Sequence, residues 1–330
     1  MTEIIAEIGQ AHDGSLGLLH SYIDALSKFD IDTIKFQTHI AEAESSEHEK
    51  FRIKFSYEDE SRFDYWKRME FSMKQWSEIK HHCDDLGINF LSTPFSNMAV
   101  DLLEEIGVKR YKIGSGDINN FLLIDKILRT NKPIIISSGL SDYEELDRTI
   151  SYISDKNSDV TLMQCTSNYP TKANEIGLNL IPEFKKRYNI PIGLSDHSGE
   201  IFPSLAATAL NAEVLEVHVV FDQMMFGPDS SSSIPMSKMN ELVDGVRMIE
   251  EMMHTPVSKT ANNETKKVFG RSLAFNKDLE IGYKVEFTDL ESKKPGDYGL
   301  SPSNYKRIVG KKLNQSVRRW EFVKEEMFDE

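Results

Sequence analysis

The 330-residue sequence has few features of secreted, membrane-bound or nucleic-acid-binding proteins. Two cysteines, Cys83 and Cys165, are too few for a disulfide framework and lack the spacing of a metal-binding motif. Cations are scarce: 39 Lys and Arg against 53 Asp and Glu give a net charge of -14, which disfavours nucleic acids and anionic membranes as partners. The N-terminal segment has no basic region and no long apolar run, so we expect a cytoplasmic protein.

A glycine-rich phosphate loop is also missing after the first apolar run, which argues against an open doubly wound sheet. Short runs rich in Ile, Val and Phe alternate with segments of helical period, as in repeated βα units. The predicted strands are residues 4–8, 33–37, 89–93, 110–114, 133–137, 160–165, 191–195 and 214–219. The predicted helices include residues 16–29, 74–86, 99–106, 143–154 and 237–253. Eight strands with intervening helices predict an α/β fold, a (β/α)8 TIM barrel.

The length suits a barrel of about 250 residues followed by a small domain. We predict a barrel domain over residues 1–253, a polar linker over 254–267 and a C-terminal module over 268–330. The module, with predicted strands at 272–275 and 284–287, is small enough that we expect it to pack against a barrel. Residues 38–72 form an acidic, aromatic insertion between repeated units, which we predict to be an active-site lid.

Polar residues interrupt the carboxyl ends of the predicted strands, where the active site of a barrel is built. In chain order these residues are Glu7, Lys35, Gln37, Thr93, Lys112, Ser115, Ser137, Ser167, Tyr169, Ser195, His197, Glu216 and His218. Lys35 and Lys112 lie inside apolar runs, where an unpaired ammonium is costly, so each needs an anion. One possibility is a structural ion pair with Glu7, Asp117 or Glu216. Convergence with serine hydroxyls and the amides of residues 114–116 favours a bound phosphate or carboxylate instead.

His197 and His218 follow consecutive strands and would meet at the barrel mouth. They suit a two-histidine metal site with open positions, although a merely hydrogen-bonded role is equally compatible with the spacing. Glu7 could complete the metal shell or act as an acid or base. Asp229 lies in a Gly-Pro-Asp turn, where its carboxylate either caps its own backbone or accepts hydrogen bonds from a sugar hydroxyl.

An ordered series of short motifs spans nearly the whole chain. The motifs are IAEIG (5–9), IKFQTH (34–39), LSTPFS (91–96), YKIGSG (111–116), ISSG (136–139), CTSNYPT (165–171), GLSDH (193–197) and GPD (227–229). Each motif is weak alone, but the ordered set resembles the sialic acid (N-acetylneuraminate) synthase family. The C-terminal module resembles the antifreeze-like SAF domain of that family, a β-clip fold.

The resemblance implies condensation of phosphoenolpyruvate with N-acetylmannosamine or a related N-acylated hexosamine, giving a sialic-type nonulosonic acid and phosphate. The implied phosphoenolpyruvate-binding residues are Lys35, Thr93, Lys112, Ser115, Ser137, Ser167 and Ser195. The implied sugar-binding residues are Gln37, Tyr169, Asp229 and Lys294. The implied catalytic residues are Glu7, Lys35 and Asp117. His197 and His218 would bind Mn²⁺ or Mg²⁺, which polarises the open-chain aldehyde of the sugar.

The sequence departs from the family pattern in the module. Lys294 stands where members often have an arginine that reaches the N-acyl group from the partner subunit of a domain-swapped homodimer. Val268 stands where an aromatic residue packs on the sugar. Legionaminic or pseudaminic acid synthesis therefore remains an alternative, as does a catalytically inactive sugar-binding homologue. A metal hydrolase on the same barrel is a further alternative, but it would need more metal ligands on the early strands.

Overall fold

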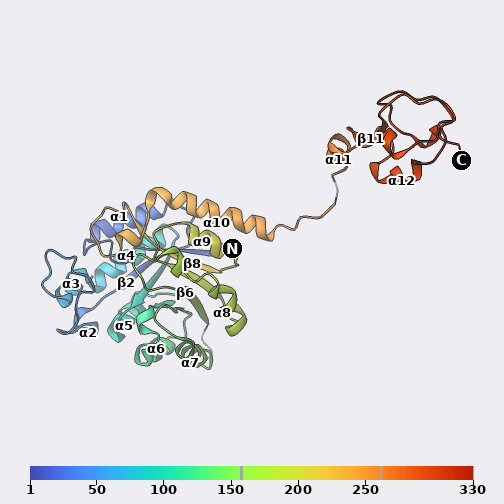
Figure 1. Ribbon diagram of the computed structural model, residues 1–330. Helices are drawn as coiled ribbons and strands as arrows, with labels where there is room; N and C mark the ends of the chain where they lie inside the picture. The colour runs from blue at the N-terminus through green and yellow to red at the C-terminus, as the bar shows by residue number, and fades with distance from the viewer. Residues whose placement is uncertain (157–158, 261, 330) are drawn as a thin grey trace. The chain divides into compact units, whose positions relative to one another are not determined.

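The computed structural model describes residues 1–156, 159–260 and 262–329, and its first unit, Met1–Thr255, contains a closed parallel barrel. Its strands are β1 (Glu3–Glu7), β2 (Thr33–Thr38), β3 (Asn89–Pro94), β4 (Tyr111–Ile113), β5 (Ile134–Ser137), β6 (Val160–Cys165), β7 (Ile192–Asp196) and β8 (Val214–Val220). Each strand pairs with the next, and β1 also pairs with β8, so the sheet closes on itself (Figure 1). This arrangement confirms the predicted (β/α)8 barrel.

Helices follow the strands and surround the barrel (Figure 1). They are α1 (Leu16–Leu26), α4 (Met73–Asp85), α5 (Asn97–Glu105), α6 (Phe121–Leu128), α7 (Tyr143–Ser154), α8 (Leu180–Tyr188), α9 (Phe202–Ala209) and α10 (Met239–His254). In α7, a capping box of Asp142 and Glu145 starts the helix, and Leu146, Ile150 and Ile153 form its buried face. Within the described residues, no helix has the length and apolar character needed to span a membrane.

The barrel interior is apolar below the strand ends. Ile5, Leu91, Ile135, Met163 and Val214, from five different strands, form a buried cluster separate from the larger core that includes the helices. Alternate residues along each strand face the interior, so this cluster fills the barrel rather than leaving a pore. The charged residues of the predicted site lie beyond this cluster along the strands, as Glu7 follows Ile5 and Glu216 follows Val214 on the same face.

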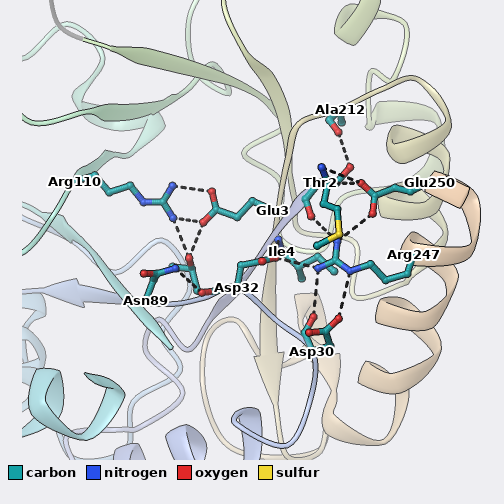
Figure 2. Close-up of polar contacts among 12 residues, drawn as sticks. Thr2, Glu3, Ile4, Asp30, Asp32, Asn89, Arg110, Ala212, Arg247 and Glu250 are labelled. Carbon is teal, nitrogen blue, oxygen red and sulfur yellow. Dashed lines mark hydrogen bonds and ion pairs between the residues drawn. The ribbon is translucent and has the colours of Figure 1, made fainter. Parts of the chain in front are cut away.

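A network of charged and polar residues joins the amino ends of the strands (Figure 2). The Arg110 guanidinium contacts the Glu3 carboxylate, and the Ile4 amide donates to Asp32 at 2.8 Å. From α10, Arg247 donates to the Thr2 carbonyl at 2.7 Å and pairs with Asp32 at 3.2 Å. Asp32 and Arg110 lie just before β2 and β4, so these contacts link the starts of β1, β2 and β4 to α10. They lie at the end of the barrel opposite the predicted active site.

The insertion, residues 38–72, contains two helices, α2 (Ala41–Glu44) and α3 (Arg62–Met69). Ala41, Tyr65, Trp66 and Met69 form their own buried cluster, against which Phe51, Phe55 and Phe63 pack. Arg68 pairs with Asp59 inside the insertion at 2.9 Å and with Asp13 of the β1–α1 loop at 2.8 Å. The insertion is thus an ordered element, and its role as a lid remains a prediction.

The second unit, Pro256–Glu330, has a separate core around Phe275, Val285, Leu313 and Val323. It contains α11 (Asn263–Phe269), β10 (Ser272–Phe275), β11 (Leu290–Lys293) and α12 (Tyr305–Ile308), with β10 and β11 antiparallel. The predicted strand at 272–275 is confirmed as β10. The predicted strand at 284–287 is wrong, because the Glu286 amide donates to the Asp289 carboxylate at 2.8 Å and turns the chain before β11.

Candidate active site

Nearly all the predicted site residues of the barrel line one cavity of about 430 Å³ at the carboxyl ends of the strands, termed the deep cavity. Its predicted members are Glu7, Lys35, Gln37, Thr93, Lys112, Ser115, Asp117, Ser137, Ser167, Tyr169, Ser195, His197 and His218. Asp229 is the exception among the barrel residues, and Lys294 belongs to the second unit. Residues from all eight strands or the loops after them therefore converge, as expected for the functional end of a TIM barrel.

A second cavity of about 540 Å³, termed the outer cavity, is lined by Asp229 and by residues of the insertion. The insertion residues are Glu49, Lys50, Arg52, Ile53, Phe55, Arg62 and Trp66. Five residues line both cavities: Gln37, Arg52, Phe95, Tyr169 and His218. These five mark the junction of the two cavities, so a ligand in one cavity lies beside a ligand in the other.

Four buried charges form the floor of the deep cavity. Lys35 Nζ lies 2.9 Å from Glu7 Oε2 and 3.5 Å from Glu216 Oε1, and Lys112 Nζ lies 2.5 Å from Glu216 Oε2. Each of the four side chains is at most 5% exposed. Both lysines therefore form ion pairs with carboxylates, which the sequence allowed as the alternative to a bound anion. The cluster still faces the deep cavity, and an ammonium carries three donors. Lys112 contacts Glu216 and Met163 Sδ, so one of its donors is left for a ligand, whereas a ligand at Lys35 would replace one of its three partners.

The lysine environments differ because Lys35 has two carboxylate neighbours and Lys112 has one. Burial opposes the charge of Lys35, but Glu216 and Glu7 outweigh it and raise the pKa of Lys35. For Lys112, burial and the nearby Lys35 outweigh Glu216 and lower its pKa. Burial also opposes ionisation of Glu216, yet both lysines hold the pKa of Glu216 below its ordinary value. Glu216 is consequently the shared counter-charge of the cluster.

Hydroxyl groups form a polar wall beside the lysines. Thr93 accepts a hydrogen bond from Lys35 at 3.4 Å, and Ser195 donates to Glu216 at 3.2 Å. The amide of Gly139 donates to Ser115 Oγ at 3.1 Å. A Cβ at Gly139 would lie 2.4 Å from Ser167 Oγ and 2.8 Å from Ser115 Oγ, so only glycine lets these hydroxyls approach the backbone. Such a wall of donors suits an anion with several oxygen atoms.

His197 and His218 lie together, with ring centroids 5.2 Å apart. His197 Nδ1 is 3.0 Å from the Thr166 carbonyl, so this nitrogen carries the proton and Nε2 is left as an acceptor, 3.1 Å from the Tyr169 hydroxyl. Burial lowers the pKa of His218 well below its ordinary value, which favours the neutral imidazole. Burial opposes the charge of His197 too, but its contacts with Cys165 outweigh burial and raise the pKa of His197. Oriented imidazole nitrogens fit a divalent metal once they are deprotonated. The described residues contain no cluster of three or more His, Cys, Asp or Glu ligands, so other positions would go to water or substrate.

Two partly buried carboxyl groups stand apart from the lysines. Burial raises the pKa of Asp229, against the opposing effect of His197. Burial also raises the pKa of Asp117, although Asn120 donates a hydrogen bond to its carboxylate at 2.9 Å. Asp117 lines the deep cavity and Asp229 the outer cavity, so the structure separates these two predicted site residues.

Two residues of the site were given no role from the sequence. Its place in the sequence marks Glu216 only as a polar strand end and a possible partner of one lysine, but it lies between both lysines. Its signal was a carboxylate inside the otherwise apolar Val-Leu-Glu-Val-His-Val-Val strand. Arg52 lies in the insertion and lines both cavities. Local sequence offered little to single it out, because several other cations occur in the same insertion.

The fold and cavity define a barrel enzyme with an anion-binding, strand-end active site, and comparisons with known proteins identify its family. The NeuB family model matches residues 22–258. The N,N'-diacetyllegionaminic acid synthase of Campylobacter jejuni is 32% identical, over 98% of this chain and 99% of that protein. The human N-acetylneuraminate-9-phosphate synthase is 31% identical, over 99% of this chain and 92% of that protein.

A solved structure agrees with the sequence relatives. The N-acetylneuraminic acid synthetase of Leptospira borgpetersenii, in complex with citrate, superposes with a TM-score of 0.71 at 29% identity, covering 80% of this chain and 89% of that one. The chain belongs to the NeuB family, whose synthases are phosphoenolpyruvate-utilising condensing enzymes that make sialic-type nonulosonic acids.

Proposed function

We propose that this chain condenses phosphoenolpyruvate with N-acetylmannosamine or a related N-acylated hexosamine, adding water and releasing phosphate. The observation that carries the proposal is the junction: a deep cavity with two lysines and a wall of hydroxyls opens directly onto a second cavity beside the histidine pair. An anionic substrate fits the first, and a hydroxyl-rich one fits the second. Legionaminic-type synthesis is the second candidate, supported by the similarity to the C. jejuni enzyme.

In this proposal, the phosphoenolpyruvate anion is bound by Lys35, Lys112 and the hydroxyls of the deep cavity. Carbon 3 of phosphoenolpyruvate attacks the aldehyde carbon of the open-chain sugar. Water adds to carbon 2 of the phosphoenolpyruvate moiety, and phosphate leaves as the bond between carbon 2 and the ester oxygen breaks. Glu7 is fully buried, accepts from Gln37 at 2.8 Å and pairs with Lys35 at 2.9 Å. These contacts support Glu7 as the group that would hold or transfer a proton beside the new bond. Asp117, with its raised pKa, is the second candidate acid or base.

The histidine pair would hold Mn²⁺ or Mg²⁺ through ring nitrogen atoms, in competition with the proton that the raised pKa of His197 favours. When bound, such an ion supplies Lewis-acid polarisation of the sugar aldehyde. The backbone contact from His197 Nδ1 to the Thr166 carbonyl orients the ring, and Tyr169 stacks on it with centroids 4.2 Å apart. Gln37, Tyr169 and Asp229 line the outer cavity and would contact the sugar.

The decisive experiment measures phosphate release from phosphoenolpyruvate across a panel of acceptor sugars. The panel contains N-acetylmannosamine, its 6-phosphate, 2,4-diacetamido-2,4,6-trideoxyhexoses and N-acetylglucosamine as the epimeric control. We expect acceptor-dependent release with an N-acylated hexosamine. Preference for a diacetamido sugar would replace the first candidate by legionaminic- or pseudaminic-type synthesis. Absence of release with every acceptor, while phosphoenolpyruvate still binds, would favour the inactive sugar-binding homologue.

We further propose that the C-terminal module is an SAF-type domain that completes the site of the partner subunit in a domain-swapped homodimer. Lys294 precedes Pro295 in an exposed turn, and its Nζ lies 5.4 Å from the Phe269 ring centroid. Val268 and Phe269 are both exposed on the unit itself, which leaves an apolar and cationic surface for a sugar site.

Complementation tests the swap. A Lys294→Ala chain and a His197→Ala chain are mixed under conditions in which subunits exchange. In a swapped heterodimer one site receives both changes and the other receives neither, so activity should rise above that of either variant alone. If Lys294→Ala is impaired and mixing raises nothing despite measured exchange, each module serves its own barrel.

A further inference from the structure

Arg52 occupies an unusual position for a residue of a surface insertion. It lies between α2 and α3, yet it lines both the deep and the outer cavity. Its guanidinium carbon is 4.9 Å from the centroid of the Tyr169 ring, a cation–π distance, and Tyr169 in turn stacks on His197. Arg52 therefore stands at the junction where, under the proposed function, the two substrates meet.

The fixed charges of the deep cavity do not by themselves suit a polyanion. Lys35 and Lys112 contribute two positive charges, and Glu7 and Glu216 contribute two negative ones, so the buried cluster sums to zero. Phosphoenolpyruvate combines a phosphate ester, of charge about -1.5 to -2 at pH 7, with a carboxylate. The metal ion proposed at the histidine pair is assigned to the sugar aldehyde, so a site that binds this ligand tightly gains from further positive charge near the same cavity.

Arg52 is available to supply that charge. The ion pairs found in the described part of the insertion join Arg62, Lys67 and Arg68 to carboxylates, and Arg52 takes part in none of them. Lys50 lines only the outer cavity, whereas Arg52 reaches the deep one as well. A guanidinium also presents a planar fork of donors that matches a carboxylate or phosphate, which an ammonium lacks.

We propose that Arg52 is a substrate-binding residue that donates hydrogen bonds to the phosphoenolpyruvate anion from the insertion side of the junction. The proposal rests on the proposed function and adds to it a ligand-binding residue outside the barrel strands. It also gives the insertion a specific role, because the aromatic core around Tyr65 and Trp66 holds in place the segment that carries Arg52. The buried cluster is then neutral, and Arg52 adds positive charge from the insertion side, beside any metal ion that His197 and His218 would hold.

The test compares Arg52→Gln, Arg52→Lys and a control, Lys54→Gln, in steady-state kinetics with each substrate varied in turn. Lys54 is an exposed cation two residues away that lines neither cavity. We expect Arg52→Gln to raise the KM for phosphoenolpyruvate about tenfold, as for loss of a charge-assisted hydrogen bond. The acceptor KM and kcat should change less than about twofold, and Arg52→Lys should fall between. Lys54→Gln should match the wild type.

Added salt provides a second readout. The KM for phosphoenolpyruvate should rise more steeply with salt in the wild type than in Arg52→Gln, because the variant has lost one screened charge–charge interaction. A rise in the acceptor KM alone would overturn the proposal and assign Arg52 to the sugar. Unchanged kinetics for Arg52→Gln would also overturn it.

Failure of the proposed function can be told apart from failure of this inference. If the wild type releases no phosphate with any acceptor, calorimetric titration with phosphoenolpyruvate alone still decides the role of Arg52. About tenfold weaker binding by Arg52→Gln, with Lys54→Gln unchanged, would support it. Equal affinities of the wild type and Arg52→Gln would exclude it.

Discussion

Charged side chains gather at both ends of the barrel, and the two ends use them differently. At the amino end, Arg110 contacts the Glu3 carboxylate and Arg247 the Thr2 carbonyl, and these contacts link the strands to one another and to α10. Neither arginine lines the deep or the outer cavity. At the carboxyl end, Lys35 and Lys112 are also paired with carboxylates, but they face the deep cavity. Ion pairing alone therefore does not distinguish a structural charge from a ligand-binding one, whereas exposure to a cavity does.

The comparison also explains the choice of cation. The guanidinium of Arg247 uses its donors on Thr2, Asp32 and Glu250, which suits a fixed structural joint. The buried ammonium of Lys112, in contrast, makes only one ion pair, with Glu216, and burial lowers its pKa. Changes at the two ends should accordingly affect different measurements.

The largest expected effect is at the carboxyl end. His197→Ala or His218→Ala should reduce kcat/KM for phosphate release about 10³-fold or more, because a metal contributes several kcal/mol of transition-state stabilisation. The melting temperature should stay near that of the wild type. His81→Ala, an exposed change on the outside of the barrel, is the matched control. Near-normal turnover by both active-site variants would remove the histidine pair from the mechanism.

The next effect is a change in the KM for one substrate and not for the other. Lys112→Ala should raise the KM for phosphoenolpyruvate by roughly 10- to 100-fold and the sugar KM little, since it removes charge-assisted bonds to one ligand. Glu216 keeps Lys35 at 3.5 Å, so the variant should still fold. Equal increases in both KM values would show that Lys112 is structural, like the arginines at the other end.

A smaller effect is expected at the amino end, and on stability alone. Arg247→Ala should lower the free energy of unfolding by about 1–3 kcal/mol, because it leaves partly buried acceptors without their donor. The change is followed by urea or thermal unfolding, with Asp244→Ala on the exposed face of α10 as control. The kcat/KM at 25 °C should be unchanged. A large loss of activity in folded Arg247→Ala enzyme would break the proposed division between the two ends.

The last expected effect is absent at neutral pH and concerns a buried histidine, His12, that has no proposed part in catalysis. Burial, with smaller contributions from His39 and Arg68, lowers the pKa of His12 to about 3. On acidification, His12 is protonated near pH 6.5 in the unfolded chain but only near pH 3 in the folded protein. The free energy of unfolding is therefore unaffected by this histidine above about pH 6.5. It decreases as the pH falls from about 6.5 towards 3, by at most about 1.4 kcal/mol per pH unit.

Urea unfolding of wild type and His12→Asn at pH 7.5, 6 and 5 tests this linkage. The wild type should lose more stability than the variant on acidification, whereas exposed His48→Asn should follow the wild type. Parallel pH dependence in all three proteins would contradict the assignment.

Much of the barrel could be predicted because its strands are short apolar runs buried on both faces, as in the Ile134–Ser137 strand. The helix α3 was not predicted, since its exposed charges hide its buried Tyr65, Trp66 and Met69, although the capping box of Ser61 and Asp64 was a usable signal. The polar residues at the predicted strand ends were enough to predict that the lysines, hydroxyls and histidines lie in one site. It could not show that Glu216 bridges both lysines or that Arg52 lines their cavity, because both features join segments far apart in the chain.

The central claim is that the carboxyl end of this barrel is a metal-assisted phosphoenolpyruvate condensation site. Its most direct test is an assay of phosphate release, with the accepted hexosamine present, by enzyme that has been exhaustively chelated and then supplied with Mn²⁺. The proposed site predicts no release above the enzyme-free blank after chelation and restored turnover with Mn²⁺, because His197 and His218 would provide the metal ligands. Full activity in the chelated enzyme would contradict the claim.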